Sequence, residues 1–252
     1  MEAHRGTHAV RGWRGFAAEF LMIAIAVFVG SMGEYFLEHK IIEERRDDGL
    51  ALMLRILEAD RKNIDEIVGH CDRGIAHLDR SKMSAFRYKK NKISRDEYFR
   101  LLADDIDNRY SYRTLFLDRT AFNSMSSVGL VSLIESPELK IAISNYYEVL
   151  GRRLDDNNKL VDTEARQYYY ESFLLKNATD DPMVEIPGEL AIRFDASFYL
   201  SLPIVIEKTT SDRFITDTDN LLIRVVDYRS LLRTIRAQNE KVERLIRQHL
   251  ES

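Results

Sequence analysis

The chain has 252 residues, of which 45% are hydrophobic and 31% are charged, so it can bury a core and does not belong to the disordered class. Its formal net charge of −4 gives no reason to expect a nucleic-acid partner, which usually requires a basic surface. A single cysteine, Cys71, excludes an internal disulfide and a cysteine-based zinc site. Glycine (11 residues) and proline (4 residues) are scarce, which predicts an all-α fold built from long helices.

A basic tail, residues 1–14, precedes an apolar segment, residues 15–37, which predicts one transmembrane helix. As a helix this segment is roughly 34 Å long, and a bilayer core of about 30 Å requires about 20 apolar residues. The part of it without any charge, residues 20–33, is short and taken alone is typical of a cleaved signal peptide. Helical periodicity continues past Gly33 without a breaker, which favours an uncleaved anchor, with the cleaved signal as the alternative.

Membrane orientation rests on the basic residues that flank this segment, since the cytoplasmic side is usually enriched in them. Three arginines precede the segment and four basic residues follow it: Arg5, Arg11, Arg14, and Lys40, Arg45, Arg46, Arg55. The balance is nearly even, but the arginines of the short tail are denser. We therefore expect a single-pass membrane protein with a cytoplasmic N-terminus and an extracytoplasmic C-terminal domain.

One face of the predicted membrane helix combines small and acidic residues. At 100° per residue, the following positions fall on one stripe: Glu19, Ala26, Gly30, Gly33 and Glu34. A small-xxx-small pair such as Ala26 and Gly30 allows a second helix to approach closely. The stripe thus predicts packing against a second copy of the chain or a partner membrane protein. The alternative is that the acids only mark the helix ends.

The remainder, residues 38–252, predicts a helical soluble domain. Apolar residues at spacings of three and four extend the first helix to about residue 80, before a basic connector at residues 82–92: Leu50, Met53, Leu54, Leu57, Ile64, Ile67, Val68, Cys71, Ile75 and Leu78. Ser94 and Glu97 form a capping box that predicts a helix at residues 95–106. A further helix is predicted at residues 115–128, ended by Gly129.

Two longer helices are expected after it. Ser136 followed by Pro137 is a helix-start signal, and that helix is predicted to reach about residue 176, before a loop near residues 177–206. The last helix, residues 217–250, carries a coiled-coil-like seam: Leu221, Val225, Tyr228, Leu232, Ile235, Asn239, Val242 and Ile246. This seam is expected to pack on the first helix of the same chain, with a seam between two chains as the alternative.

Two stretches carry a resemblance to a known family. Residues 18–25 (AEFLMIAI) open the apolar helix, and residues 120–134 (TAFNSMSSVGLVSLI) lead into Ser136-Pro137 and a Tyr146-Tyr147 pair. The pattern resembles an uncharacterised family of bacterial single-pass membrane proteins with a basic tail, one transmembrane helix and a helical soluble domain. The resemblance implies this topology, a location in the bacterial inner membrane and no catalytic activity.

Candidate sites for chemistry are few. Glu66, His70 and His77 share one side of the first helix with Cys71 beside them, a set that can ligate a transition metal, although a solvated helix face is the favoured interpretation. The run of residues 168–170, three tyrosines, either lines a ligand pocket or completes the core. No phosphate loop or catalytic motif is present, so we expect no enzyme and no cofactor. The predicted function is a membrane-anchored interaction or scaffold protein, with an extracytoplasmic ligand-sensing or accessory domain as the alternative.

Overall fold

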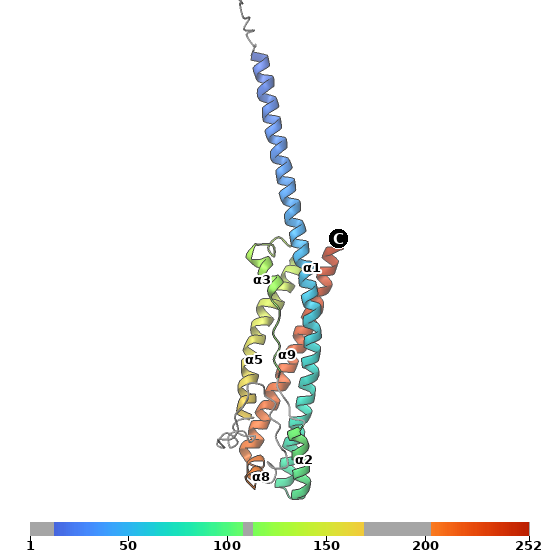
Figure 1. Ribbon diagram of the computed structural model, residues 1–252, viewed down its shortest axis with the longest axis vertical. Coiled ribbons are helices and arrows are strands. Elements are labelled where there is room, and N and C mark those ends of the chain that lie inside the picture. The colour runs from blue at the N-terminus through green and yellow to red at the C-terminus, as the bar shows by residue number, and fades with distance from the viewer. Residues whose placement is uncertain (1–12, 108–112, 169–202, 252) are drawn as a thin grey trace, which may run out of the picture.

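The computed structural model describes residues 13–107, 113–168 and 203–251, and within these ranges it is helical without strands (Figure 1). The first helix, α1 (Trp13–Lys89), has 77 residues and forms the long axis of the molecule. The other elements, in chain order, are α2 (Arg95–Asp107), α3 (Thr120–Ser127), α4 (Pro137–Ser144), the π-helical turn η1 (Asn145–Leu150), α5 (Gly151–Arg166), α8 (Pro203–Thr209) and α9 (Asp212–Leu250). The all-α prediction is confirmed.

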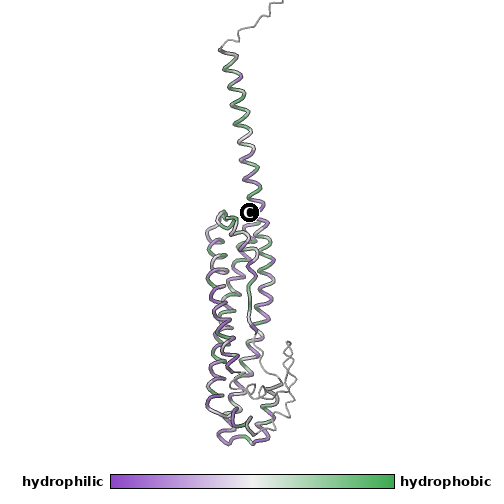
Figure 2. The backbone as a smooth tube through the Cα atoms, turned by 60° about the vertical axis from the view of Figure 1, so that its left-hand side comes forward, coloured by the Kyte–Doolittle hydropathy of each residue, from purple (hydrophilic) through white to green (hydrophobic). Residues whose placement is uncertain are grey.

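The N-terminal part of α1 projects beyond the other helices, as Figures 1 and 2 show. Among the described residues α1 is the one helix long and apolar enough to cross a membrane, and none of its apolar window is buried. Its large side chains, from Phe16 to Leu37, are about 40–70% exposed on every side of the helix. This part of α1 has no interior of its own to pack against.

Further along, α1 packs against α9. Eleven α1 positions alternate at spacings of three and four, and all are buried: Leu50, Met53, Leu57, Asp60, Ile64, Ile67, Cys71, Gly74, Leu78, Ser81 and Ala85. The predicted α9 seam is likewise buried from Leu221 to Ile246, and the Asn239 side chain donates a hydrogen bond to the Leu57 carbonyl of α1. In the structure the seam therefore packs on α1 of the same chain, as expected.

Ion pairs flank this contact and fix its antiparallel register. Acids of α1 meet arginines of α9 in one half of the bundle (Glu58–Arg247, Asp65–Arg236, Asp72–Arg229), and lysines of α1 meet acids of α9 in the other half (Lys82–Asp219, Lys89–Asp212). Partly exposed pairs each contribute about 0–1 kcal/mol, so they specify direction more than they stabilise. A parallel arrangement would place like charges together.

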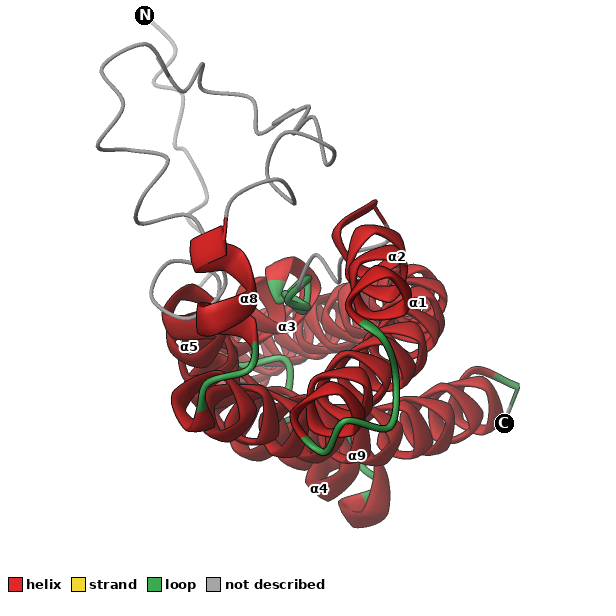
Figure 3. Ribbon diagram, turned by 90° about the horizontal axis from the view of Figure 1, so that it is seen from below, coloured by secondary structure: helices red, strands yellow, loops and turns green. Residues whose placement is uncertain are grey.

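The helices α4 and α5, joined through η1, form a third rod beside α1 and α9. Seen along the bundle, α2 lies beside α1, and α4 lies beside α9 (Figure 3). The start of this rod follows the prediction, because the Ser136 side chain accepts a hydrogen bond from the Leu139 amide and Pro137 occupies the first turn. The rod is described to Tyr168, and the predicted loop near residues 177–206 lies mostly outside the described residues, apart from the first turn of α8.

Two predicted boundaries are wrong. The basic connector at residues 82–92 is helical to Lys89, because Ser81 and Ala85 continue the buried seam and the lysines pair with α9. The helix predicted at residues 115–128 begins only at Thr120, because the preceding residues form an extended segment whose backbone bonds to side chains of other helices. We call residues 113–119 the strap.

Candidate functional site

The stripe predicted on the membrane helix lies in the projecting part of α1. Ala26, Gly30, Gly33 and Glu34 are exposed and Glu19 is half-buried. Nothing lies within 4 Å of the position that a Cβ would take at Gly30 or Gly33. Gly30 and Gly33 thus have open space around them within the described part of the chain, and the role of the stripe in helix association stays a prediction.

The bundle interior holds a buried polar cluster that joins three rods and the strap. Asp60 of α1, 2% exposed, accepts a hydrogen bond from the Tyr146 hydroxyl at 3.2 Å and a long one from the Asp118 amide at 3.5 Å. The Tyr146 hydroxyl in turn accepts from the Asn239 side chain of α9 at 3.1 Å. Tyr146 is thus both donor and acceptor, which links α1, η1 and α9 through one atom.

The π-helical turn explains how neighbouring tyrosines both face this interior. Successive residues of an α-helix point about 100° apart, but Tyr146 and Tyr147 are 0% and 1% exposed. The wider turn of η1 rotates less per residue and brings both rings inward, where Tyr147 stacks on Phe122 of α3. The Gln238 side chain donates to the Ala142 carbonyl just before this turn and ties it to α9.

Burial raises the pKa values of the acid and the two phenols in this cluster. Desolvation raises the pKa of Asp60 to about 6, although the hydrogen bonds from Asp118 and Tyr146 oppose the shift. Desolvation and the nearby Asp60 carboxylate also raise the pKa values of Tyr146 and Tyr147, so both phenols stay neutral. The cluster therefore holds one carboxylate that titrates near neutral pH.

A second buried network clamps the strap. The Tyr228 hydroxyl of α9 accepts a hydrogen bond from the Leu115 amide at 2.8 Å and donates to the Asn158 side-chain oxygen of α5 at 2.8 Å. The Asn158 amide nitrogen donates to the Leu115 carbonyl at 2.8 Å. Both backbone groups of Leu115 are satisfied, and its side chain is 2% exposed. These contacts hold the strap in the groove between α5, α9 and α1.

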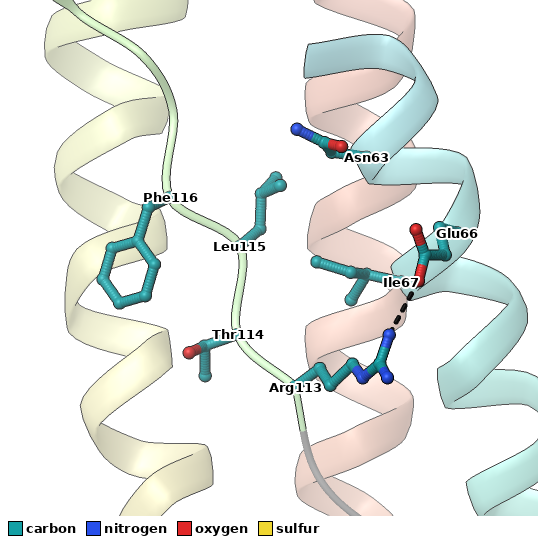
Figure 4. A pocket seen from close by; sticks show the side chains of 7 residues that line it. All are labelled: Asn63, Glu66, Ile67, Arg113, Thr114, Leu115 and Phe116. Atoms are coloured by element: carbon teal, nitrogen blue, oxygen red, sulfur yellow. Dashed lines mark hydrogen bonds and ion pairs between the residues drawn. The ribbon is translucent and has the colours of Figure 1, made fainter. Parts of the chain in front are cut away.

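An open cleft of about 510 Å³ lies between the strap and α1 (Figure 4). Asn63, Glu66 and Ile67 of α1 line one side, and residues 113–116 line the other. The Arg113 guanidinium pairs with the Glu66 carboxylate at 2.7 Å across the cleft. This is the size range of ligand pockets, although the cleft is open to solvent.

The metal-ligand candidates of α1 do not converge. Glu66 is exposed and pairs with Arg113, whereas His77 is buried, and its burial with the nearby Arg80 lowers its pKa to about 4. Within residues 13–107, 113–168 and 203–251, no group of three histidine, cysteine or acidic side chains is arranged to hold a metal ion. Of the three consecutive tyrosines, Tyr168 is buried against Phe214 at a ring distance of 5.9 Å, and the other two lie outside the described residues.

Sequence reasoning missed Asp60, Tyr146 and the Asn158–Tyr228 pair. A signal existed for Asp60, since it occupies a buried position in the three-four alternation between Leu57 and Ile64. An acid at such a position predicts a buried polar contact. Tyr146 and Asn158 give no comparable signal, because their placement depends on the π-helical turn and on the strap.

Comparison of the chain with protein-family models, with curated proteins and with solved structures gave no match. The resemblance to the family of bacterial single-pass membrane proteins therefore stays a prediction.

Proposed function

We propose that this protein is a membrane-anchored helical interaction protein that associates through its membrane helix. The observation that carries the proposal is the projecting part of α1, whose apolar side chains are exposed all round while the same helix continues into the bundle. A soluble monomer rarely exposes an apolar patch beyond a few hundred Å². A lipid bilayer covers a helix of this length and composition on every side.

The unbroken helix between the two parts supports an anchor over a cleaved signal. No break in α1 separates the apolar stretch from the seam that begins at Leu50, so one helix joins the two parts. A cleaved signal is normally followed by a distinct mature start, whereas here one α-helix runs through to Lys89. We propose the bacterial inner membrane from the resemblance to bacterial single-pass proteins. The flanking arginines support an N-terminus in the cytoplasm and a bundle outside.

We assign self-association to the membrane segment and not to the α9 seam. The α9 seam is covered by α1 of the same chain. The small residues Ala26 and Gly30 lie on an uncovered face, which suits close helix packing in lipid. An accessory role beside a different membrane protein is the second candidate, and the open cleft on the bundle favours it.

The test is the mass of the full chain in detergent, corrected for bound detergent, together with its flotation with membranes. We expect a membrane-bound oligomer that becomes a monomer in the double variant Gly30→Leu, Gly33→Leu. The control is Ala24→Leu, which places a leucine about 140° away from Glu19 on the opposite face. A monomeric wild type, or an oligomer that ignores both variants, overturns self-association, and a chain that does not float overturns the anchor.

A further inference from the structure

A turn without charged side chains lies at the end of the bundle from which the projecting part of α1 emerges. It consists of residues 128–134 (VGLVSLI), between α3 and α4, and we call it the apolar turn. Figure 1 shows α3 at that end of the bundle, beside the C-terminal end of α9. Two contacts agree with this placement: a Cβ at Gly49 of α1 would lie 2.8 Å from Met125 of α3, and His249 of α9 lies 4.0 Å from Asp47 of α1. The apolar turn thus lies on the side of the bundle that faces the proposed membrane.

The apolar side chains of this turn divide into an inner and an outer set. Ile134 is 1% exposed, and Leu130 and Val131 pack partly against the core, so they hold the turn on the bundle. Val128 and Leu133, in contrast, are 67% and 47% exposed. A single exposed apolar side chain is common on any protein surface. The position of these two beside the membrane anchor gives them their significance.

The backbone of the apolar turn is largely paired within the turn and its neighbours. The Gly129 and Leu130 amides donate to carbonyls in the last turn of α3, and the amides of residues 132–134 donate to the carbonyls three positions earlier. The Lys140 side chain donates to the Ser132 carbonyl at 2.8 Å. Transfer of a turn out of water is costly mainly when its backbone groups lose their hydrogen bonds. A turn with this pairing can leave bulk water at a low cost.

We propose that the apolar turn rests, through Val128 and Leu133, in the headgroup region of the lipid bilayer that α1 crosses, as a second contact beside the anchor. Gly49, the level of Met125, is about 18 Å of helix past Leu37, and the headgroup region extends about 5–7 Å beyond the hydrocarbon. Membrane helices are tilted by about 20° on average, and a tilt of α1 toward α3 lowers the turn to the lipid. The contact is therefore shallow and fixes the direction of tilt.

The lipid surface suits this turn better than a second protein does. A stable protein interface covers about 800 Å² on each partner, and two exposed side chains supply far less. The bilayer, however, is held next to the turn by the anchor, and a weak contact is populated when its partner is tethered nearby. The inference rests on the proposed membrane anchor and deepens it, because it assigns a membrane contact to the bundle itself.

The experiment places a fluorophore on the turn of the full chain in vesicles of phosphatidylcholine and phosphatidylglycerol. Val128→Cys and Leu133→Cys are labelled separately with an environment-sensitive dye, and a nitroxide-labelled phosphatidylcholine serves as the quencher. Wild type is the labelling blank, because Cys71 is fully buried. Ile223→Cys is the matched control, since Ile223 is 57% exposed on α9 near the Lys82–Asp219 pair, at the far end of the bundle. We expect blue-shifted emission and loss of about half of it or more at the turn, and neither change at Ile223.

A second arm adds a charge to the turn. Val128→Asp should reduce quenching of the dye at Leu133→Cys to the level at Ile223, because a carboxylate keeps the turn in water. Ile223→Asp is its control and should leave that quenching unchanged. Both sites are exposed, so circular dichroism should show the same helix content in all variants.

The outcomes separate this inference from the anchor. Labels on the turn that are quenched no more than the label at Ile223, in a chain that floats with the vesicles, overturn the inference and leave the anchor standing. A blue shift without quenching, lost when the chain is diluted in excess lipid, would mean that a second copy covers the turn and also overturns it. A chain that does not float overturns the anchor and this inference together.

Discussion

The two halves of α1 are one helix with two kinds of surface. From Phe16 to Leu37 its apolar side chains cover the whole circumference and are exposed, whereas from Leu50 to Ala85 they occupy a stripe at spacings of three and four and are buried. A stripe needs a partner on one side only, and α9 supplies it. An apolar surface all round needs cover on every side, which a lipid bilayer or the core of a large protein provides. The comparison shows that the width of the apolar face, and not the helix itself, separates an anchor from a bundle element.

The first test makes the same leucine-to-alanine substitution in each half of α1. Leu57→Ala removes a fully buried side chain of the seam, so we expect it to lower the free energy of unfolding of the bundle by about 2–5 kcal/mol. Leu21→Ala removes a side chain that is 59% exposed and contacts no bundle helix, so bundle stability should be unchanged. Chemical denaturation of the full chain in detergent, followed by circular dichroism, measures both. Equal effects would mean that the projecting segment packs on the bundle.

The second test concerns the acid within the seam. Because burial raises the pKa of Asp60 from 3.8 to about 6, the folded state binds this proton more tightly than the unfolded chain. The stability that this proton binding contributes is fully present below about pH 4 and is lost as the pH rises to about 6. One pKa unit corresponds to about 1.36 kcal/mol, so the free energy of unfolding should fall by about 3 kcal/mol over this range. Denaturation of wild type and Asp60→Asn at pH 4 to 8 isolates it, since the variant lacks this titration.

The outcome is the difference between the two pH profiles, since other acids contribute equally to both. Wild type should lose stability relative to Asp60→Asn between pH 4 and pH 6 and run parallel to it above pH 7. Profiles that stay parallel throughout would mean that water reaches the Asp60 carboxylate in the folded protein.

The third test compares two buried tyrosines. Tyr228→Phe leaves the Leu115 amide and the Asn158 oxygen without their partner, so we expect a loss of about 1–3 kcal/mol and faster amide exchange at Leu115. Tyr147→Phe is the control, because the Tyr147 hydroxyl is buried without a hydrogen-bond partner within the described residues. Its removal should be neutral or slightly stabilising. A Tyr228→Phe variant as stable as Tyr147→Phe would show that the strap is not held by this clamp.

The elements that could be predicted were those specified by local signals. Ser136 caps α4, and Gly129 takes the left-handed conformation, with φ of 78°, after α3. The α9 seam also follows its periodicity, including the polar position at Asn239, whose side chain bonds to Leu57 of α1. Each of these depends on residues close in sequence, so spacing alone sufficed.

The candidate sites could not be predicted because they depend on contacts between distant residues. Leu115 has a helical apolar spacing, yet it lies in the strap because Asn158 and Tyr228 satisfy its backbone. Tyr146 faces Asp60 only because η1 is wider than an α-helix. Tertiary contacts of this kind override local propensity, and a single sequence does not reveal them.

The smallest expected changes in stability come from alanine substitutions at two glycines, Gly69 and Gly49, in the bundle half of α1. A Cβ at Gly69 would meet only the end of the Arg73 side chain at 3.8 Å, so Gly69→Ala should raise the free energy of unfolding by about 0.5–1 kcal/mol through better helix propensity. At Gly49 the same Cβ would lie 2.8 Å from the Met125 side chain of α3, which would have to shift. Methionine is adaptable, so we expect Gly49→Ala to be close to neutral instead of stabilising. Thermal unfolding of both variants measures the difference. An equal gain in stability at both sites would mean that α3 can shift on α1 without cost. A smaller gain at Gly49 would mean that this position is glycine because Met125 of α3 packs closely against it.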